Sequence, residues 1–295
     1  MIIGLIGDLE GEESAAVSCL RLLGERGDVQ VAYKLGDLRF GMGPDPEAYL
    51  AAIESVCAEF EIQLVCIGGN HENWALLDTL WADPSWQDED GGPAPIALTD
   101  HITMLPRGHR WEIGGRSFVA LGSAPSINRH LLTEGIDWWP SEVLREEHVA
   151  ATIAGGHAEV MLTHDSPGHP YCTEPVADLI RNNPLGWPDS SLQYAQDGVE
   201  KITRAVLGVK PLLLAHGHFH VQGEAVVRLP GAATYTTIWS LAARHDPGNV
   251  RVLDLDTLTD AGQPETHRSG HCPASRGTVG RSADSDMVGR SPYAT

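Results

Sequence analysis

Basic residues are scarce in this sequence. Its 295 residues include 20 Lys and Arg against 40 Asp and Glu, which gives a formal net charge of −20 at pH 7. Such a charge repels polyanions, so neither a nucleic-acid backbone nor an anionic membrane surface is expected as the main partner. A small or peptide-borne phosphate is compatible with this charge only if metal ions supply positive charge locally.

Paired cysteines and long apolar runs are also missing. The five cysteines include no Cys-x-x-Cys pair, and Cys19, Cys57 and Cys66 fall in apolar periodic stretches, as is typical of reduced core thiols in a cytoplasmic protein. The apolar stretch at residues 1–6 lacks a basic flank and is too short for a signal-peptide core or a membrane span. The sequence therefore predicts a soluble cytoplasmic protein. A Gly-x4-Gly-Lys phosphate loop is absent as well, which disfavours a nucleotide-triphosphate motor.

Short apolar runs alternate with segments of helical period. The runs have the length of buried strands and lie at residues 2–6, 29–35, 63–67, 117–121, 159–163 and 212–215. Helices are expected at residues 13–25, 46–60, 72–81, 141–154 and 190–207. The clearest of these is 46–60, where Asp45 can cap the helix and Pro46 suits its first position. This alternation predicts an α/β layered fold.

The C-terminal segment has a different composition. Residues 261–295 are rich in Gly, Ser, Pro and Arg and contain few large apolar residues, so they cannot bury a core and are expected to be disordered. We therefore expect one domain over residues 1–260. Shorter β-like runs at 225–229, 234–239 and 250–255 are expected to complete a sheet. Substrate choice is expected to depend on the loops at 39–47, 86–110, 123–140 and 166–190.

Polar clusters directly follow several of the apolar runs. They are Gly7-Asp8-Leu9-Glu10, Gly36-Asp37, Gly69-Asn70-His71-Glu72, Thr163-His164-Asp165 and Gly217-His218-Phe219-His220. In layered α/β folds ligands bind at the carboxyl ends of the strands, so these clusters can converge. Their oxygen and imidazole donors suit Mn²⁺, Fe, Zn²⁺ or Co²⁺, whereas a structural zinc site would contain thiolates. The donors are too many for one ion and fit two ions about 3.5–4 Å apart that share a carboxylate.

This ordered series resembles the calcineurin-like metallophosphoesterase superfamily. The pattern of that family is Asp-x-His, Gly-Asp, Gly-Asn-His-Asp/Glu, a lone His and then Gly-His-x-His, and the match extends over roughly residues 1–260. The resemblance implies an α/β (α+β) fold, a four-layer β-sandwich flanked by helices. It also implies a dinuclear metal-dependent hydrolase of phosphoester bonds, either a phosphatase or a phosphodiesterase, with a metal-bridging hydroxide as nucleophile. Mn²⁺ is the expected metal, with Fe, Zn²⁺, Co²⁺ or Mg²⁺ as alternatives.

The resemblance also implies a role for each matching residue. Asp37 would bridge the two ions, and His71 would contact the phosphate and protonate the leaving oxygen. The other matching ligands would be Asp8 and His220 at the first ion, and Asn70, His164 and His218 at the second.

Glu10 departs from the family pattern, which has a histidine at this position. A carboxylate is still a competent ligand, so Glu10 is a candidate ligand of the first ion. In the alternative, Glu10 is a solvated residue of the first helical turn. If its presence impairs one site, the protein would be a catalytically impaired metal- or phosphoprotein-binding module on the same fold.

Several other polar residues have a structural interpretation beside the functional one. Asp8 and Asp37 are equally typical of helix caps or turns, and His71 and His164 of core or loop histidines. Arg39 either binds the substrate phosphate or is a surface arginine. The remaining alternatives concern residues outside the motif pattern: Trp138 and Trp139 pack or line a pocket, Asp165 orients His164 or begins a turn, and His216 lies outside the ligand set.

Overall fold

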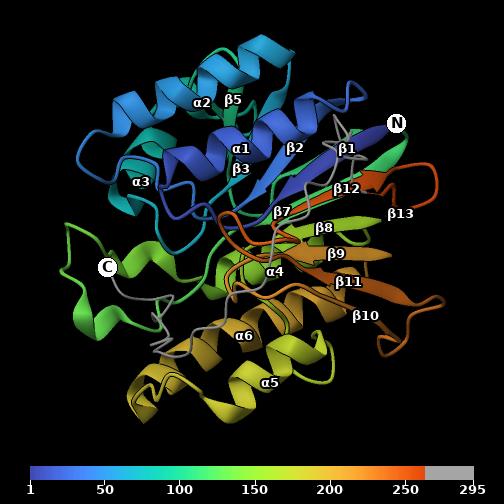
Figure 1. Cartoon of the computed structure of the whole chain (residues 1–295). Coiled ribbons are helices and arrows are strands. Elements are labelled where there is room, and N and C mark those ends of the chain that lie inside the picture. The colour runs from blue at the N-terminus through green and yellow to red at the C-terminus, as the bar shows by residue number, and fades with distance from the viewer. Residues whose placement is uncertain (263–295) are drawn as a thin grey trace, which may run out of the picture. The chain divides into compact units, whose positions relative to one another are not determined.

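Two mixed β-sheets lie face to face, and helices cover both outer faces (Figure 1). The structure is a computed structural model that describes residues 1–262. These layers confirm the predicted α/β sandwich flanked by helices. Nearly all of the segment that we expect to be disordered lies outside the described residues, so that expectation and the domain boundary stay predictions. No helix within residues 1–262 is long and apolar enough to cross a membrane.

The first sheet has a parallel centre and antiparallel edges, in the order β13-β12-β1-β2-β3-β5-β4. Its parallel strands are β1 (Ile2–Ile6), β2 (Val29–Leu35), β3 (Gln63–Ile67) and β5 (Ile102–Leu105). The flanking strands are β4 (Ile96–Ala97), β12 (Val250–Asp254) and β13 (Thr259–Asp260). The helices on its outer face are α1 (Glu13–Gly24), α2 (Pro46–Phe60) and α3 (Trp74–Ala82).

The second sheet repeats this arrangement in the order β10-β11-β9-β8-β7-β6. Its parallel centre is β7 (Arg116–Leu121), β8 (Val160–Thr163), β9 (Leu213–His216) and β11 (Thr236–Ser240). The antiparallel edges are β6 (Arg110–Ile113) and β10 (Gly223–Val227). The helices beside it are α4 (Glu146–Ala154), α5 (Glu174–Asn182) and α6 (Asp189–Val209), and the 3₁₀ turns of the fold are η1 (Pro84–Trp86), η2 (Arg129–Leu131) and η3 (Pro140–Glu142).

Three apolar layers hold the sandwich together. Tyr33, Phe118 and Trp239 belong to the core between the two sheets. A second core joins α1, α2 and α3 to the first sheet, and a third joins α4 and α6 to the second sheet. Each large apolar side chain that is buried in this way stabilises the fold by about 1.5–3 kcal/mol. The cysteines at 19, 57, 66 and 172 are free and buried in the fold, as expected of core thiols.

Local sequence explains where several helices begin. Asp45 caps α2 as predicted, since its Oδ1 accepts a hydrogen bond from Ala48 N at 3.0 Å. The helix α3 begins at Trp74, two residues later than expected, because Asn73 is its cap and accepts from Leu76 N at 3.0 Å. The helix α4 begins only at Glu146, because the start of the expected segment forms the turn η3 instead.

Candidate metal centre

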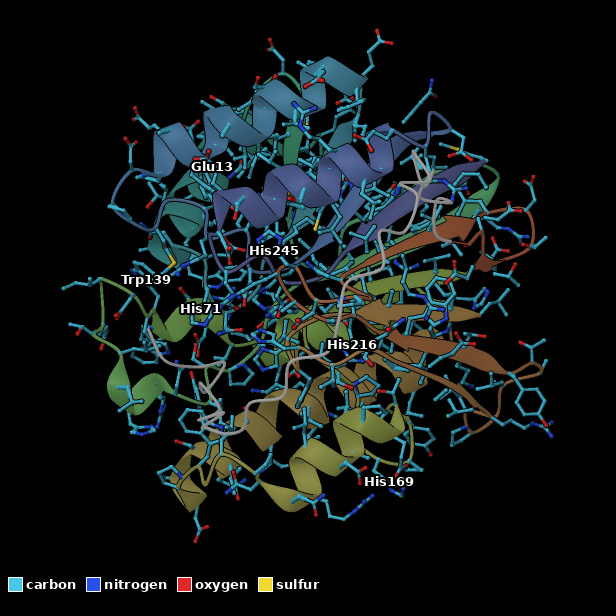
Figure 2. The ribbon with its side chains drawn as sticks, viewed as in Figure 1. Glu13, His71, Trp139, His169, His216 and His245 are labelled. Carbon is cyan, nitrogen blue, oxygen red and sulfur yellow. The ribbon has the colours of Figure 1, made fainter. Side chains whose placement is uncertain are left out.

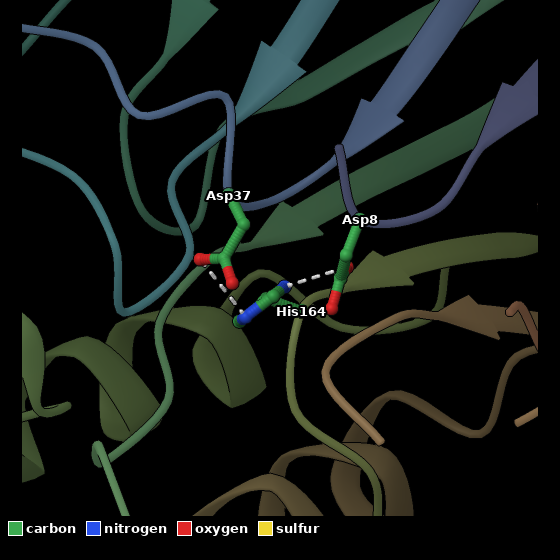
Figure 3. A group of neighbouring side chains, drawn as sticks. All are labelled: Asp8, Asp37 and His164. Atoms are coloured by element: carbon green, nitrogen blue, oxygen red, sulfur yellow. Dashed lines mark ion pairs between the residues drawn. The ribbon is translucent and has the colours of Figure 1, made fainter. Parts of the chain in front are cut away.

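Side chains from the carboxyl ends of both sheets meet at one place. Asp8 follows β1, Asp37 follows β2 and His164 follows β8. Figure 3 shows the two carboxylates of the first sheet reaching the imidazole of the second, with His164 Nε2 3.3 Å from Asp37 Oδ1 and Nδ1 3.8 Å from Asp8 Oδ1. The predicted convergence of distant motifs is therefore present for these three residues.

His164 is held in the orientation of a metal-ligating histidine. Its Nδ1 donates to the backbone oxygen of Leu35 at 2.7 Å, and a carbonyl can only accept, so the proton lies on Nδ1. This leaves Nε2 to face Asn70 Oδ1 at 2.9 Å and Asp37 Oδ1 at 3.3 Å. A backbone carbonyl that fixes the tautomer and the ring of a ligand histidine is the usual arrangement at metal centres. Donors about 3 Å apart are also the spacing that one ion with ligands at about 2.1 Å requires.

A second group of possible metal ligands lies around Asp8. His220 Nε2 lies 2.9 Å from Asp8 Oδ2 and 3.2 Å from Glu10 Oε1. The backbone N–H of His218 also donates to Asp8 Oδ2, at 2.9 Å. Asp8 Oδ1 is buried and has no hydrogen-bond partner within residues 1–262. A buried carboxylate oxygen without a donor is costly, and a cation at this point would satisfy it.

The acidic and histidine side chains that could bind a metal ion form three overlapping groups. Within each group the possible ligand atoms lie within 4.8 Å of one another. The groups are Asp8, Asp37 and His164; Asp8, Glu10 and His220; and Glu10, Asp37 and His71. Each of the three carboxylates, Asp8, Glu10 and Asp37, belongs to two of these groups, so any of them has the position of a shared ligand. The Glu10 side chain is only 13% exposed, and Glu10 precedes the first residue of α1, Glu13, so Glu10 is not a solvated residue of a helical turn. These residues fit a site for more than one cation.

Charges inside this cluster shift the pKa values strongly. Burial raises the pKa of Asp8, but the electrostatic attraction of the nearby His164 ring and a hydrogen bond from His220 outweigh burial and hold that pKa well below its usual range. For His220 burial lowers the pKa, yet hydrogen bonds to Asp8 and Glu10 raise it to about 10. In the ion-free chain the protonated His220 is thus a local cation between two carboxylates. A metal ion has to displace that proton when it binds.

The backbone at the site is strained. Glu10, Asp37, His218 and His220 have φ values of 55°, 52°, 66° and 56°, in the left-handed region that residues other than glycine seldom adopt. Arg39, two residues after Asp37, also has a positive φ of 61°. Such strain concentrates at functional sites because the surrounding structure must hold it.

The glycines of the motifs make room for the polar side chains. A Cβ on Gly36 would lie 2.1 Å from His164 Nδ1, and one on Gly217 would lie 2.3 Å from Asp8 Oδ1. Gly36 also has φ +91°, so it serves both the turn and the close approach. For Gly217 the close approach is the requirement.

The other residues that the sequence singled out lie around this cluster or in the core. The His218 ring lies 5.0 Å from that of His164, but the donor groups above do not include it. His71 lies in Figure 2 on the side where the parallel strands end, and its backbone N–H donates to Asp37 Oδ1 at 2.9 Å. Arg39 is half-buried, and its Nη1 donates to the Glu10 carbonyl at 3.2 Å. Trp139 packs into the core beside the first sheet, as its packing interpretation predicts.

Asp165 and His216 lie next to the site without joining a donor group. Asp165 Oδ1 accepts from Ser166 N at 2.8 Å, so the carboxylate starts a turn, while Leu35 orients His164. His216 ends β9 with Nδ1 3.0 Å from the Gly217 oxygen, and burial lowers its pKa to about 4. His216 is therefore neutral at pH 7.

Sequence reasoning assigned no role to several buried residues around the site. Glu72, the last residue of its motif, accepts from Leu38 N at 2.9 Å and from Phe40 N at 2.6 Å. It therefore ties the loop after β2 to the loop after β3. Ser126 accepts from Asn70 Nδ2 at 3.2 Å and donates to Glu142. Neither Ser126 nor Glu142 belongs to a recognisable motif, whereas the acidic fourth position of Gly69-Asn70-His71-Glu72 was a signal for Glu72.

Comparison with known proteins leaves the family open. No family model and no curated protein matches the chain. A hypothetical protein from Thermus thermophilus aligns with 82% of this chain and 77% of its own length, at 15% identity and a TM-score of 0.41. Sulfate thiohydrolase SoxB from Thermus thermophilus, solved with glycerol, aligns with 85% of this chain at 14% identity and a TM-score of 0.39, and the alignment spans 40% of SoxB. Similarities of this size do not assign a family or an activity.

Proposed function

We propose that the protein is a dinuclear metal-dependent phosphoester hydrolase of the calcineurin-like metallophosphoesterase type. The observation that supports this most is the meeting of Asp8, Asp37 and His164 from three strand ends and both sheets. Asp37 would be the shared carboxylate. Asp8, Glu10 and His220 would hold one ion, and Asn70, His164 and His218 the other.

Two divalent ions, when bound, would activate water and neutralise the charge of a phosphate. The chain itself supplies orientation and proton transfer. Leu35 fixes the tautomer of His164 through the bond to Nδ1. His71, half-buried at the edge of the cluster, would donate a proton to the departing oxygen. Arg39 would present its guanidinium to a substrate phosphate from beside Glu10.

The catalytically impaired alternative depends on Glu10 spoiling one site. The contact between Glu10 Oε1 and His220 Nε2 at 3.2 Å instead keeps a donor where the family pattern has its histidine. This geometry favours an active enzyme with a carboxylate-rich centre. Mn²⁺ is the metal that we propose, since oxygen-rich sites with some imidazole suit it.

The proposal can be tested with chelator-stripped protein, a nitrophenyl phosphomonoester and a bis-nitrophenyl phosphodiester. We expect hydrolysis to return on addition of Mn²⁺, and the preferred ester to show which substrate class the site accepts. Asp37→Ala should abolish both ion binding and turnover. Stoichiometric Mn²⁺ binding without turnover of any phosphorylated metabolite, cyclic nucleotide or phosphopeptide would favour the binding module instead.

A further inference from the structure

The side-chain amide of Asn70 has to point one way to hold a metal ion. A carboxamide has an oxygen that accepts and a nitrogen that donates, and the two ends have nearly the same shape. Only the oxygen can bind a cation. In the structure Asn70 Oδ1 faces His164 Nε2 at 2.9 Å, and Nδ2 faces Ser126 Oγ at 3.2 Å.

The hydrogen bond between Ser126 and Glu142 determines which end of the Asn70 amide can face Ser126 Oγ. Ser126 Oγ lies 2.6 Å from Glu142 Oε2, while Glu142 Oε1 accepts from Ser126 N at 2.7 Å and from Tyr194 Oη at 2.8 Å. Burial raises the pKa of Glu142, but the hydrogen bonds from Ser126 and Tyr194 favour its ionised form. A carboxylate only accepts, so the hydroxyl hydrogen of Ser126 is committed to Glu142. Ser126 Oγ then has only lone pairs to offer Asn70. With an ion held by Asn70 Oδ1 and the unprotonated Nε2 of His164, the inverted amide would turn its NH2 group toward the ion. It would also place two acceptors against each other at Ser126, and this second effect costs about 1–3 kcal/mol.

We infer that Ser126 and Glu142 are positioning residues that fix the Asn70 oxygen toward the metal centre. The inference rests on the proposed function, in which Asn70 is a ligand. All three side chains are shielded from solvent, with residue exposures of 3% for Asn70, 1% for Ser126 and 0% for Glu142. Ser126 comes from the loop after β7 and Glu142 from η3, so a part of the chain without any metal-binding motif sets the geometry of one ligand.

The test uses Ser126→Ala and Glu142→Gln in the full chain, stripped of metal and titrated with Mn²⁺ by calorimetry. Loss of a partner around a metal ligand weakens metal affinity by about 10–100-fold, and we expect this loss at one ion only. Glu142→Gln keeps the shape, but its oxygen must face Ser126 N–H, so its amide nitrogen faces Ser126 Oγ. The hydroxyl hydrogen then turns toward Asn70 and favours the inverted amide.

Ser123→Ala is the matched control. Ser123 is a buried serine of the same loop, and its hydroxyl donates to the backbone oxygen of Glu142. It should bind both ions like the parent chain. Electron paramagnetic resonance of the Mn²⁺ protein gives a second readout, because a coupled two-ion signal should disappear at limiting metal in Ser126→Ala and Glu142→Gln but persist in Ser123→Ala.

The outcomes separate this inference from the proposed function. If the parent chain binds two ions and both variants bind them equally well, Ser126 and Glu142 do not position Asn70, and the proposed function stands. If the parent binds no ion, both proposals are wrong. Should Ser126→Ala fail to fold, Glu142→Gln decides, since unfolding on heating reports its integrity independently of metal.

Discussion

Glu10 is the residue at which this chain differs from the motif series that it resembles. With Glu10 as a ligand, Asp8, Glu10 and Asp37 contribute −3 to the centre, where the family pattern gives −2. Two divalent ions then leave a net +1 in place of +2. A carboxylate is also a harder ligand than an imidazole, so the first ion should be Mn²⁺ or Mg²⁺ in preference to Zn²⁺.

We expect Glu10→Ala to weaken the binding of one ion and Glu10→His to shift the preference toward Zn²⁺. We expect this because Glu10 contacts His220 and belongs to two of the possible ligand groups. Titration of the stripped parent and of both variants with Mn²⁺ and with Zn²⁺ checks this. Tight binding of two ions by Glu10→Ala would remove Glu10 from the ligand set.

His71 should behave differently, because its proposed task is proton donation. His71→Ala is expected to retain both ions and to lose kcat by about 10²–10⁴-fold, the usual contribution of general acid catalysis. The loss should shrink for nitrophenyl esters, whose leaving group needs little protonation, and grow for alkyl esters. Equal losses for the two ester types would contradict the assignment, and loss of an ion would instead make His71 a ligand through its group with Glu10 and Asp37.

At the scale of helices and strands, the sequence predicted the elements that a local apolar pattern determines. The apolar runs at 2–6, 29–35 and 63–67 coincide with β1, β2 and β3, and 46–60 coincides with α2. The helix α5 lies within the expected loop 166–190, although Val176, Leu179 and Ile180 repeat at helical spacing, and this amphipathic pattern was the signal for it. The strand β5 has four residues and owes its place to pairing with β3, which no local pattern encodes.

The same division holds for the candidate site. The motifs of Asp8 and Asp37 could be predicted to converge, because parallel strands of one sheet bring their carboxyl ends to one edge. The approach of His164 also depends on how the second sheet, which contains β8, packs on the first. The roles of Ser126 and Glu142 could not, because each depends on a contact between segments that are distant in the chain and carry no motif.

The turn after β2 provides a test at this scale. In Gly36→Ala the new Cβ would meet His164 Nδ1 at 2.1 Å, whereas in Gly43→Ala it would meet nothing within 4 Å, although the two glycines have nearly the same φ of +91° and +92°. Both variants should therefore lose stability from backbone strain, by about 1–2 kcal/mol. Only Gly36→Ala should also lose Mn²⁺ binding. Thermal unfolding and calorimetry measure the two effects separately, and equal ion binding by both variants would mean that His164 is not held against Gly36.

At the scale of the whole molecule, the acidic charge means that ion binding should increase the stability of the folded chain. The chain carries a formal charge of −20, and the buried carboxylates of Asp8 and Asp37 add to its self-repulsion. Ions that bind only the folded chain stabilise it, by about 2.7 kcal/mol at a concentration 100 times Kd. Mn²⁺ should therefore raise the Tm of the stripped protein by several degrees.

The rise in Tm on addition of Mn²⁺ should depend on pH, and the protonation of His220 determines the direction of that dependence. Its pKa is raised to about 10, so at pH 6 and at pH 8 the ion has to displace one proton, and its affinity should fall about tenfold for each pH unit lost. At a fixed Mn²⁺ concentration the rise in Tm should be larger at pH 8 than at pH 6. Asp37→Ala serves as the control, since without the shared carboxylate Mn²⁺ should change its Tm little at either pH. A rise in Tm that is the same in parent and variant would show that Mn²⁺ stabilises the acidic surface in general, and the centre at the strand ends would not be the site of binding.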